Sequence, residues 1–156
     1  MHATTHTMPH DPAHAAHHEP PGFWRSYIFS IDHKIIGIQY ALTALAFLLF
    51  GFCLMGMMRW QIAHPGQSVP VVGPLLATLF GDVAAKGIMS ADLYNTFGAM
   101  HGTIMVFLAV VPLLTGAFGN YLVPIQVGAC DMAFPRVNMA SYQFYFLGGV
   151  IMFSSF

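Results

Sequence analysis

The chain has 156 residues, of which 56% are hydrophobic and 7% are charged, and its formal net charge at pH 7 is −1. Soluble domains carry about 25% charged residues, so the composition excludes an ordinary soluble domain and predicts a membrane protein. A net charge this close to zero, without a basic face, also excludes nucleic acid as a partner. Two cysteines, Cys53 and Cys130, are too few for a disulfide framework, and we expect free thiols near opposite membrane faces.

The first 22 residues form a segment rich in histidine and proline. Its histidines are His2, His6, His10, His14, His17 and His18. The segment has almost no apolar residues to bury, which predicts a disordered tail, and it lacks the apolar core of a signal peptide. Clustered histidines can bind Zn, Cu or Ni, but no spacing in this tail specifies a geometry.

Three apolar runs follow, at residues 35–58, 95–118 and 139–156. The first two exceed the ~20 residues that cross a bilayer as a helix. The third stops inside its own apolar run, and we therefore expect the chain to be the front part of a longer one. The pattern predicts an all-α, polytopic transmembrane bundle with two complete spans and the start of a third.

The segments between the runs carry caps and turns. Asp32-His33-Lys34 precedes the first run and is typical of a polar interfacial cap, and Asp92 is placed to cap the second. Residues 64–90 are rich in Pro and Gly, which predicts a loop, with a short interfacial helix at 74–80 that has Pro74 in its first turn. Arg59 closes the first run, where an arginine usually extends to the interface.

The basic residues outside the apolar runs are unevenly placed. In an up-and-down arrangement, one membrane side receives Arg25, Lys34 and Arg136, and the other receives Lys86 and Arg59. The positive-inside rule then places the N-terminus in the cytoplasm. Asp131 lies on that same side.

The second run contains one ionisable residue, His101. A titratable ring inside a membrane span is a functional-site hypothesis by default. Gly98 and Gly102 leave the helix surface beside the ring nearly bare, as coordination to a flat macrocycle requires. Two other interpretations stay open from spacing alone: a hydrogen bond from His101 to a neighbouring helix, or Gly98 and Gly102 as a helix-packing notch.

Five motifs at ordered positions resemble subunit I of the haem–copper oxidases, of the cytochrome c oxidase type. The most specific are GNYLVP at 119–124 and GACDMAFPR at 128–136; the others are DHK at 32–34, Arg59 with HPG at 64–66, and YN at 94–95 before His101. The resemblance covers residues 23–156. It implies the N-terminal part of a twelve-helix subunit, with the 1–22 tail on the cytoplasmic side and outside the resemblance.

For the cofactors, the resemblance implies that His101 is one axial ligand of the low-spin haem a. It implies that Arg59 hydrogen-bonds the formyl group of this haem and that Tyr94 lies near it. Met105 projects from the same helix face as His101, so it cannot be the opposite ligand. The second axial ligand, and the ligands of the high-spin haem and the copper, are not among these 156 residues.

For proton transfer, the resemblance implies that Asp131 is the mouth of the D pathway and that Asn120, Asn138 and Ser141 are neutral groups along it. From the residues alone, Asp131 is an interfacial loop acid paired with Arg136. The chain departs from the family pattern at three positions. Met139 replaces a second asparagine, Cys130 replaces a proline, and Gln61 replaces a glutamate near a Ca or Na site.

The implied function is terminal respiratory oxidation. Electrons from cytochrome c enter through subunit II, oxygen is reduced to water, and protons are pumped across a bacterial or organellar inner membrane. The implied partners are subunits II and III and the lipid bilayer. A quinol oxidase of the same superfamily is the nearest alternative. A haem-free transporter component or assembly protein is the alternative from another class, and the segment alone is expected to be inactive.

Overall fold

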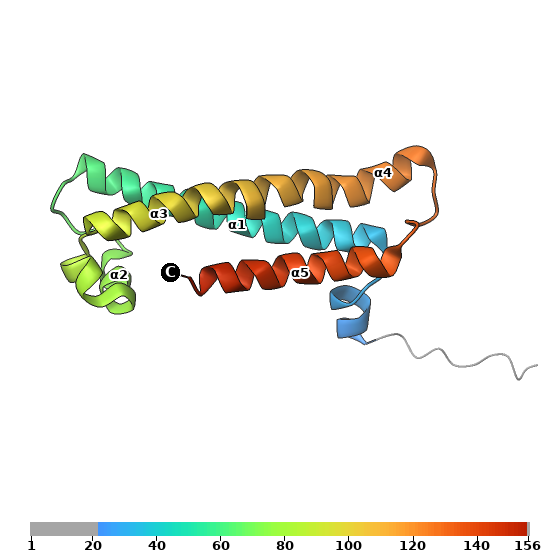
Figure 1. Ribbon diagram of the computed structural model, residues 1–156, viewed down its shortest axis with the longest axis horizontal. Coiled ribbons are helices and arrows are strands. Elements are labelled where there is room, and N and C mark those ends of the chain that lie inside the picture. The colour runs from blue at the N-terminus through green and yellow to red at the C-terminus, as the bar shows by residue number, and fades with distance from the viewer. Residues whose placement is uncertain (1–21, 156) are drawn as a thin grey trace, which may run out of the picture.

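The computed structural model describes residues 22–155, and within them the chain is helical with no strand (Figure 1). The elements in order are η2 (Trp24–Ile28), α1 (His33–Ala63), α2 (Gly73–Phe80), η3 (Gly81–Gly87), α3 (Ala91–Thr103), η4 (Ile104–Val110), η5 (Pro112–Phe118), α4 (Gly119–Val127) and α5 (Pro135–Phe153). α3, η4, η5 and α4 join end to end into one long helix. This helix, α1 and α5 lie side by side, and α2 lies at one end. The predicted all-α fold is confirmed. The histidine-rich segment 1–21 lies outside the described residues, so its predicted properties stay predictions.

Two of these helices are long and apolar enough to cross a membrane, His33–Ala63 with 31 residues and Ala91–Val127 with 37. At 1.5 Å per residue they are about 46 and 55 Å long, more than the ~30 Å hydrocarbon core. The apolar runs 35–58 and 95–118 lie inside them, and the helix ends extend beyond the runs. α5 begins at Pro135, ahead of the apolar run at 139, because a proline is readily accommodated in the first helical turn.

The helix ends follow the predicted caps at two of three places. Asp32 caps α1, since its carboxylate accepts the backbone N–H of Lys34 at 2.8 Å. α2 begins with Pro74 in its first turn, as expected. The predicted cap at Asp92 is wrong, because Ser90 is the last non-helical residue and its hydroxyl accepts the N–H of Leu93 at 3.2 Å. Asp92 is already in the first turn of α3.

The inward face of α1 follows a heptad-like stripe. Its buried residues include His33, Gly37, Tyr40, Ala44, Phe47, Gly51, Leu54 and Met58. Alternate steps of three and four residues keep one side of a helix against its neighbours. Two glycines elsewhere make close approach possible: a Cβ at Gly116 would lie 2.5 Å from the Tyr40 ring, and one at Gly149 would lie 2.4 Å from the Phe47 ring.

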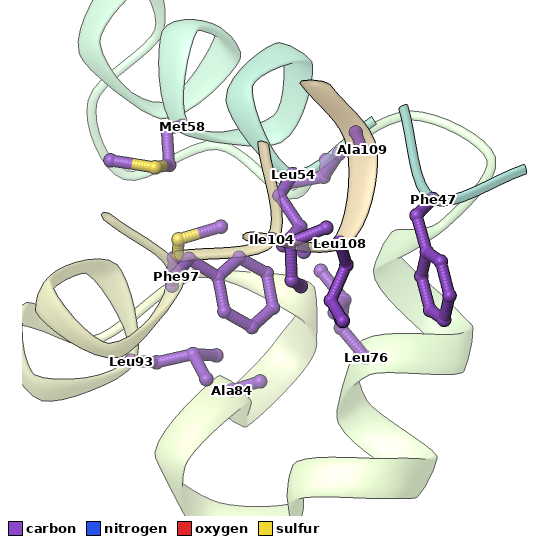
Figure 2. Close-up of a cluster of buried hydrophobic side chains, with 12 residues drawn as sticks. Phe47, Leu54, Met58, Leu76, Ala84, Leu93, Phe97, Ile104, Leu108 and Ala109 are labelled. Atoms are coloured by element: carbon purple, nitrogen blue, oxygen red, sulfur yellow. The ribbon is translucent and has the colours of Figure 1, made fainter. Parts of the chain in front are cut away.

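The larger core cluster lies where α1, α2, η3 and the first half of the long helix meet (Figure 2). Phe97, Leu54 and Ile104 are among its most completely buried side chains. A smaller cluster of Ile36, Tyr40 and Ala117 lies near the start of α1. The apolar packing is therefore concentrated toward the α2 end of the bundle.

The long helix contains two prolines, Pro112 and Pro124, which have no backbone N–H. In the α-helical stretch around Pro124, the missing donor is the one that would bond the carbonyl of Asn120, four residues earlier. His33 Nδ1 of α1 lies 3.0 Å from this oxygen. Around Pro112 the long helix is wound as a π-helix, at Ile104–Val110 and Pro112–Phe118, where a carbonyl pairs with the N–H five residues on. There the Tyr145 hydroxyl of α5 donates to Leu108 O at 2.7 Å.

Large apolar side chains also lie on the outside of the bundle. Leu42, Leu45, Leu49 and Phe52 on α1 are 49–68% exposed. Such a surface is suited to lipid or to further helices rather than water. The cysteines are free, as predicted, and both are exposed. Cys53 is about 30 Å along α1 from His33, whereas Cys130 lines a pocket with His33 and Lys34, which places the two thiols toward opposite ends.

Candidate functional site

His101 is half-buried on α3, and its ring is hydrogen-bonded to a backbone carbonyl. Its Nδ1 atom lies 2.9 Å from the carbonyl oxygen of Gly51 on α1. A carbonyl oxygen only accepts hydrogen bonds, so Nδ1 carries the proton and donates it. In the neutral ring, Nε2 then holds the lone pair. This is the arrangement of histidines that bind a metal through one nitrogen and are oriented through the other.

The surroundings of His101 bear on the alternatives that the sequence left open, which were a hydrogen bond to a neighbouring helix and a helix-packing notch at Gly98 and Gly102. A Cβ at Gly98 would meet Met58 Cε at 3.3 Å, so this glycine does pack against α1. A Cβ at Gly102 would meet nothing within 4 Å. The packing interpretation therefore applies to Gly98, and the helix surface at Gly102, beside the imidazole, is open. The hydrogen bond to a neighbouring helix also exists, and it leaves Nε2 free for a ligand.

Met105 lies one turn after His101 and packs over the same residue of α1. A Cβ built at Gly51 would come within 2.7 Å of Met105 Sδ. Since the His101 ring reaches the Gly51 carbonyl, the two side chains leave the same face of their helix, as predicted. Met105 is therefore not placed to bind the opposite side of a macrocycle held by His101.

Tyr94 and Arg59 lie toward the α2 end of the bundle. Tyr94 is two turns before His101 and packs, half-buried, against the larger core cluster. Arg59 is exposed near the end of α1, about 12 Å along that helix from Gly51. No group of three or more His, Cys, Asp or Glu side chains within residues 22–155 is placed to hold a metal ion. A single protein nitrogen such as His101 Nε2 fits a haem iron, which takes four of its ligands from the macrocycle.

A partly polar pocket of about 300 Å³ lies toward the other end, between α1, the long helix and α5. It opens at the surface of the bundle, where Thr115 and Ser141 are exposed, and we call it the interior pocket for its place between the helices. Its lining residues are Tyr40, Val111, Pro112, Thr115, Gly116, Asn120, Asn138, Ser141 and Tyr145. It contains three of the four predicted proton-transfer residues, although Asn120 is on α4 and the other two are on α5. The pocket has room for several waters, and its hydroxyl and amide groups can form hydrogen bonds with them.

Asp131 lies outside this pocket, on the loop that joins α4 to α5. It is exposed, and its carboxylate accepts the backbone N–H of Met132 at 2.7 Å. It lines a surface pocket of about 250 Å³ with Ile31, Asp32, His33, Lys34 and Cys130. No ion pair joins it to Arg136 within the described residues. The pairing expected from the residues alone is therefore absent.

Two polar residues of α1 belong to this region although the sequence did not identify them as site residues. The Tyr40 hydroxyl lies 2.6 Å from Ser141 Oγ in the interior pocket. His33, which was interpreted as part of an interfacial cap, is only 4% exposed and bonds to Asn120. The signal that could have found them is their spacing: both lie on the heptad-like stripe of α1, where a polar side chain must be inward-facing.

The comparisons with known proteins agree with the fold. The family model described as "Cytochrome C and Quinol oxidase polypeptide I" matches residues 35–156. The chain belongs to this family. This confirms the resemblance to haem–copper oxidase subunit I that the sequence motifs indicated. The family implies haem as a cofactor.

Curated relatives match over most of the chain. Cytochrome c oxidase subunit 1 of Thermostichus vulcanus is 40% identical over 141 residues, 88% of this chain and 22% of the relative. The alternative cytochrome c oxidase subunit 1 of Bradyrhizobium diazoefficiens is 40% identical over 139 residues, 89% of this chain and 20% of the relative. Cytochrome c oxidase subunit 1 of Cereibacter sphaeroides is 32% identical over 143 residues, 86% of this chain and 25% of the relative. The chain thus spans about a fifth to a quarter of the length of these relatives.

Proposed function

We propose that the chain is the N-terminal part of the catalytic subunit of a terminal respiratory cytochrome c oxidase. The full subunit reduces oxygen to water with electrons from cytochrome c and couples this to proton pumping. In this segment, His101 would hold a low-spin haem a through Nε2, and Asp131 would form the entrance of the D pathway. The observation that carries the proposal is the His101–Gly51 hydrogen bond, which leaves Nε2 with a lone pair beside the open surface at Gly102.

The chain's own residues prepare the haem site. The hydrogen bond at Nδ1 fixes the tautomer and the orientation of the His101 ring. Arg59 would donate a hydrogen bond to the formyl group of haem a, and a cationic donor there would withdraw electron density and raise the reduction potential. Tyr94, which packs against the larger core cluster, would lie near the same group. The haem would supply a one-electron relay.

The polar half of the bundle serves proton uptake. Asp131 is exposed to solvent at a surface pocket, where a carboxylate can collect protons. Asn120, Asn138 and Ser141 line the interior pocket, where neutral groups hold waters in file without trapping a charge. Tyr40 belongs to the same set through its contact with Ser141. Asp131 is therefore the entry group and the interior pocket is the first stage of the path.

The distribution of charge supports an orientation. Arg25, Lys34 and Arg136 lie on or beside the segments at the Asp131 end, whereas Arg59 and Lys86 lie toward the α2 end (Figure 1). We place the Asp131 end and the N-terminus in the cytoplasm by the positive-inside rule. The membrane is a bacterial or organellar inner membrane. The exposed apolar faces of the helices meet lipid or the rest of the oxidase, with subunits II and III as partners and cytochrome c acting through subunit II.

A reduced-minus-oxidised spectrum with pyridine-haem analysis, made on the complex from its native membrane, tests the proposal. A haem a signature supports the cytochrome c oxidase and gives Arg59 its formyl partner. Haems b or o alone would favour a quinol oxidase, which the description of the matching family also includes. A complex without any haem would leave the transporter or assembly protein as the remaining alternative and contradict the role of His101.

A further inference from the structure

His33 lies between the two polar pockets of the Asp131 end. Its ring lines the surface pocket that contains Asp131, although the residue is only 4% exposed. On its other side, Nδ1 lies 3.0 Å from the backbone carbonyl oxygen of Asn120. Asn120 in turn is buried and lines the interior pocket. His33 is therefore the residue that touches both the mouth and the first interior group of the proposed proton path.

The carbonyl that His33 contacts has lost its usual partner. In an α-helix it would accept the N–H of residue 124, and that residue is Pro124, which has none. A buried carbonyl without a donor destabilises the folded state. Because a carbonyl oxygen only accepts, His33 Nδ1 carries the proton and replaces the missing helical bond. The bond can form with the neutral ring and with the imidazolium, since Nδ1 is protonated in both.

The position of His33 on α1 makes this bond a positioning element. His33 is the first residue of α1, directly after the Asp32 cap, so its backbone belongs to a capped helical turn. Two turns further on, the Tyr40 hydroxyl lies 2.6 Å from Ser141 Oγ. α1 thus holds α4 through a backbone carbonyl and α5 through a hydroxyl, at the two sides of the interior pocket.

We propose that His33 is a positioning residue for proton uptake. Its Nδ1–H bond replaces the one that Pro124 removes and holds α4 where the Asn120 amide faces the interior pocket. Losing the bond lets the end of α4 shift, so that Asn120 no longer lies between the Asp131 mouth and the pocket. This inference rests on the proposed role of Asp131 and Asn120 in proton uptake.

A matched pair of substitutions tests the donor itself. In His33→Asn, the amide nitrogen takes the place of Nδ1 and keeps a donor. In His33→Leu, a side chain of nearly the same shape removes it. Proton-uptake rate during reoxidation of the fully reduced oxidase complex is measured for both, with haem content from reduced spectra. We expect severalfold slower uptake in His33→Leu with unchanged haem, and a rate near the wild type in His33→Asn. Equal rates in the two variants would overturn the proposal.

Pro124→Ala supplies the second arm, because it restores the helical N–H that Asn120 O lacks. Alone it should leave uptake near the wild-type rate, and in His33→Leu/Pro124→Ala it should recover most of what His33→Leu loses. A double variant as slow as His33→Leu overturns the proposal. If His33→Leu does not assemble, recovery of haem and of uptake in the double variant gives the same support. If neither assembles, His33 acts on folding and not through Asn120, which also overturns it.

Asp131→Asn, measured alongside, separates the two levels of the argument. Slow uptake in Asp131→Asn together with normal uptake in His33→Leu would support the proposed proton path and contradict only the role of His33. Normal uptake in both variants contradicts the proposed path itself.

Discussion

The two halves of this helical bundle are packed in opposite ways. The half toward α2 is filled by twelve buried apolar residues drawn from most of the elements (Figure 2). The half toward Asp131 has only three residues in its apolar cluster, together with a pocket lined by hydroxyl and amide groups. A haem ligand needs a dry and rigid setting, whereas a proton path needs space for waters. Under the proposed function, these two requirements fall at different ends of the same three helices.

The largest expected effect is in the haem half, from His101→Ala. Removing the imidazole removes the proposed iron ligand, so the low-spin haem band should disappear and turnover should fall to background. Met105→Leu is the matched control, because that side chain leaves the same helix face and is not a ligand in this arrangement. Reduced spectra of the purified complexes measure both. A low-spin band that survives in His101→Ala would show that another residue holds the haem.

In the proton half, Asp131→Asn should slow proton uptake by about a hundredfold or more, because a positioned proton-transfer group contributes about 10²- to 10⁴-fold. The amide keeps the size of the side chain and can still accept the Met132 N–H, so haem content should not change. Uptake and pumping in reconstituted vesicles measure the effect. Wild-type turnover and pumping in this variant would mean that protons enter elsewhere.

The shape of the interior pocket gives the next prediction. Gly116→Ala places a Cβ 2.5 Å from the Tyr40 ring, so the ring must shift, which disturbs its contact with Ser141. Overpacking of this kind costs about 1–3 kcal/mol, and we expect slower proton uptake and a lower melting temperature. Gly119→Ala is the control, because its Cβ would meet nothing within 4 Å. Equal behaviour of the two variants would contradict the close packing of Tyr40 on the long helix.

Among these variants, Arg59→Met should change activity least, and it tests whether Arg59 contacts the haem. Loss of the cationic donor should shift the haem a absorption band and lower its reduction potential, while haem content and proton uptake stay nearly unchanged. Spectra and a redox titration measure both quantities. An unmoved band would mean that Arg59 only extends to the membrane interface.

The sequence predicted where the long helices lie better than it predicted which side of each helix is buried. The apolar runs located both long helices, but α1 is apolar on nearly all sides, so hydropathy could not show which side is buried. The polar residues His33 and Tyr40 mark that side. His33 was missed because a polar residue at a helix start is also typical of a cap, and Tyr40 because an aromatic residue is common anywhere in an apolar helix. His101 stood out as the ionisable residue of its run. Its partner is a backbone carbonyl on another helix, at Gly51, and no side-chain pattern predicts such a contact.

One proline of the long helix, Pro124, has a consequence for the order of assembly. A helix alone in lipid must satisfy its own backbone groups, and this one lacks the usual donor for the carbonyl of Asn120. The helix synthesised before it, α1, carries the His33 donor for that carbonyl. Packing against α1 therefore completes the hydrogen bonding of the long helix, and the Tyr145 hydroxyl of α5 later adds a bond to Leu108 O. The second helix reaches its final stability only when its neighbours are in place, so helices synthesised in sequence depend on one another for a finished subunit.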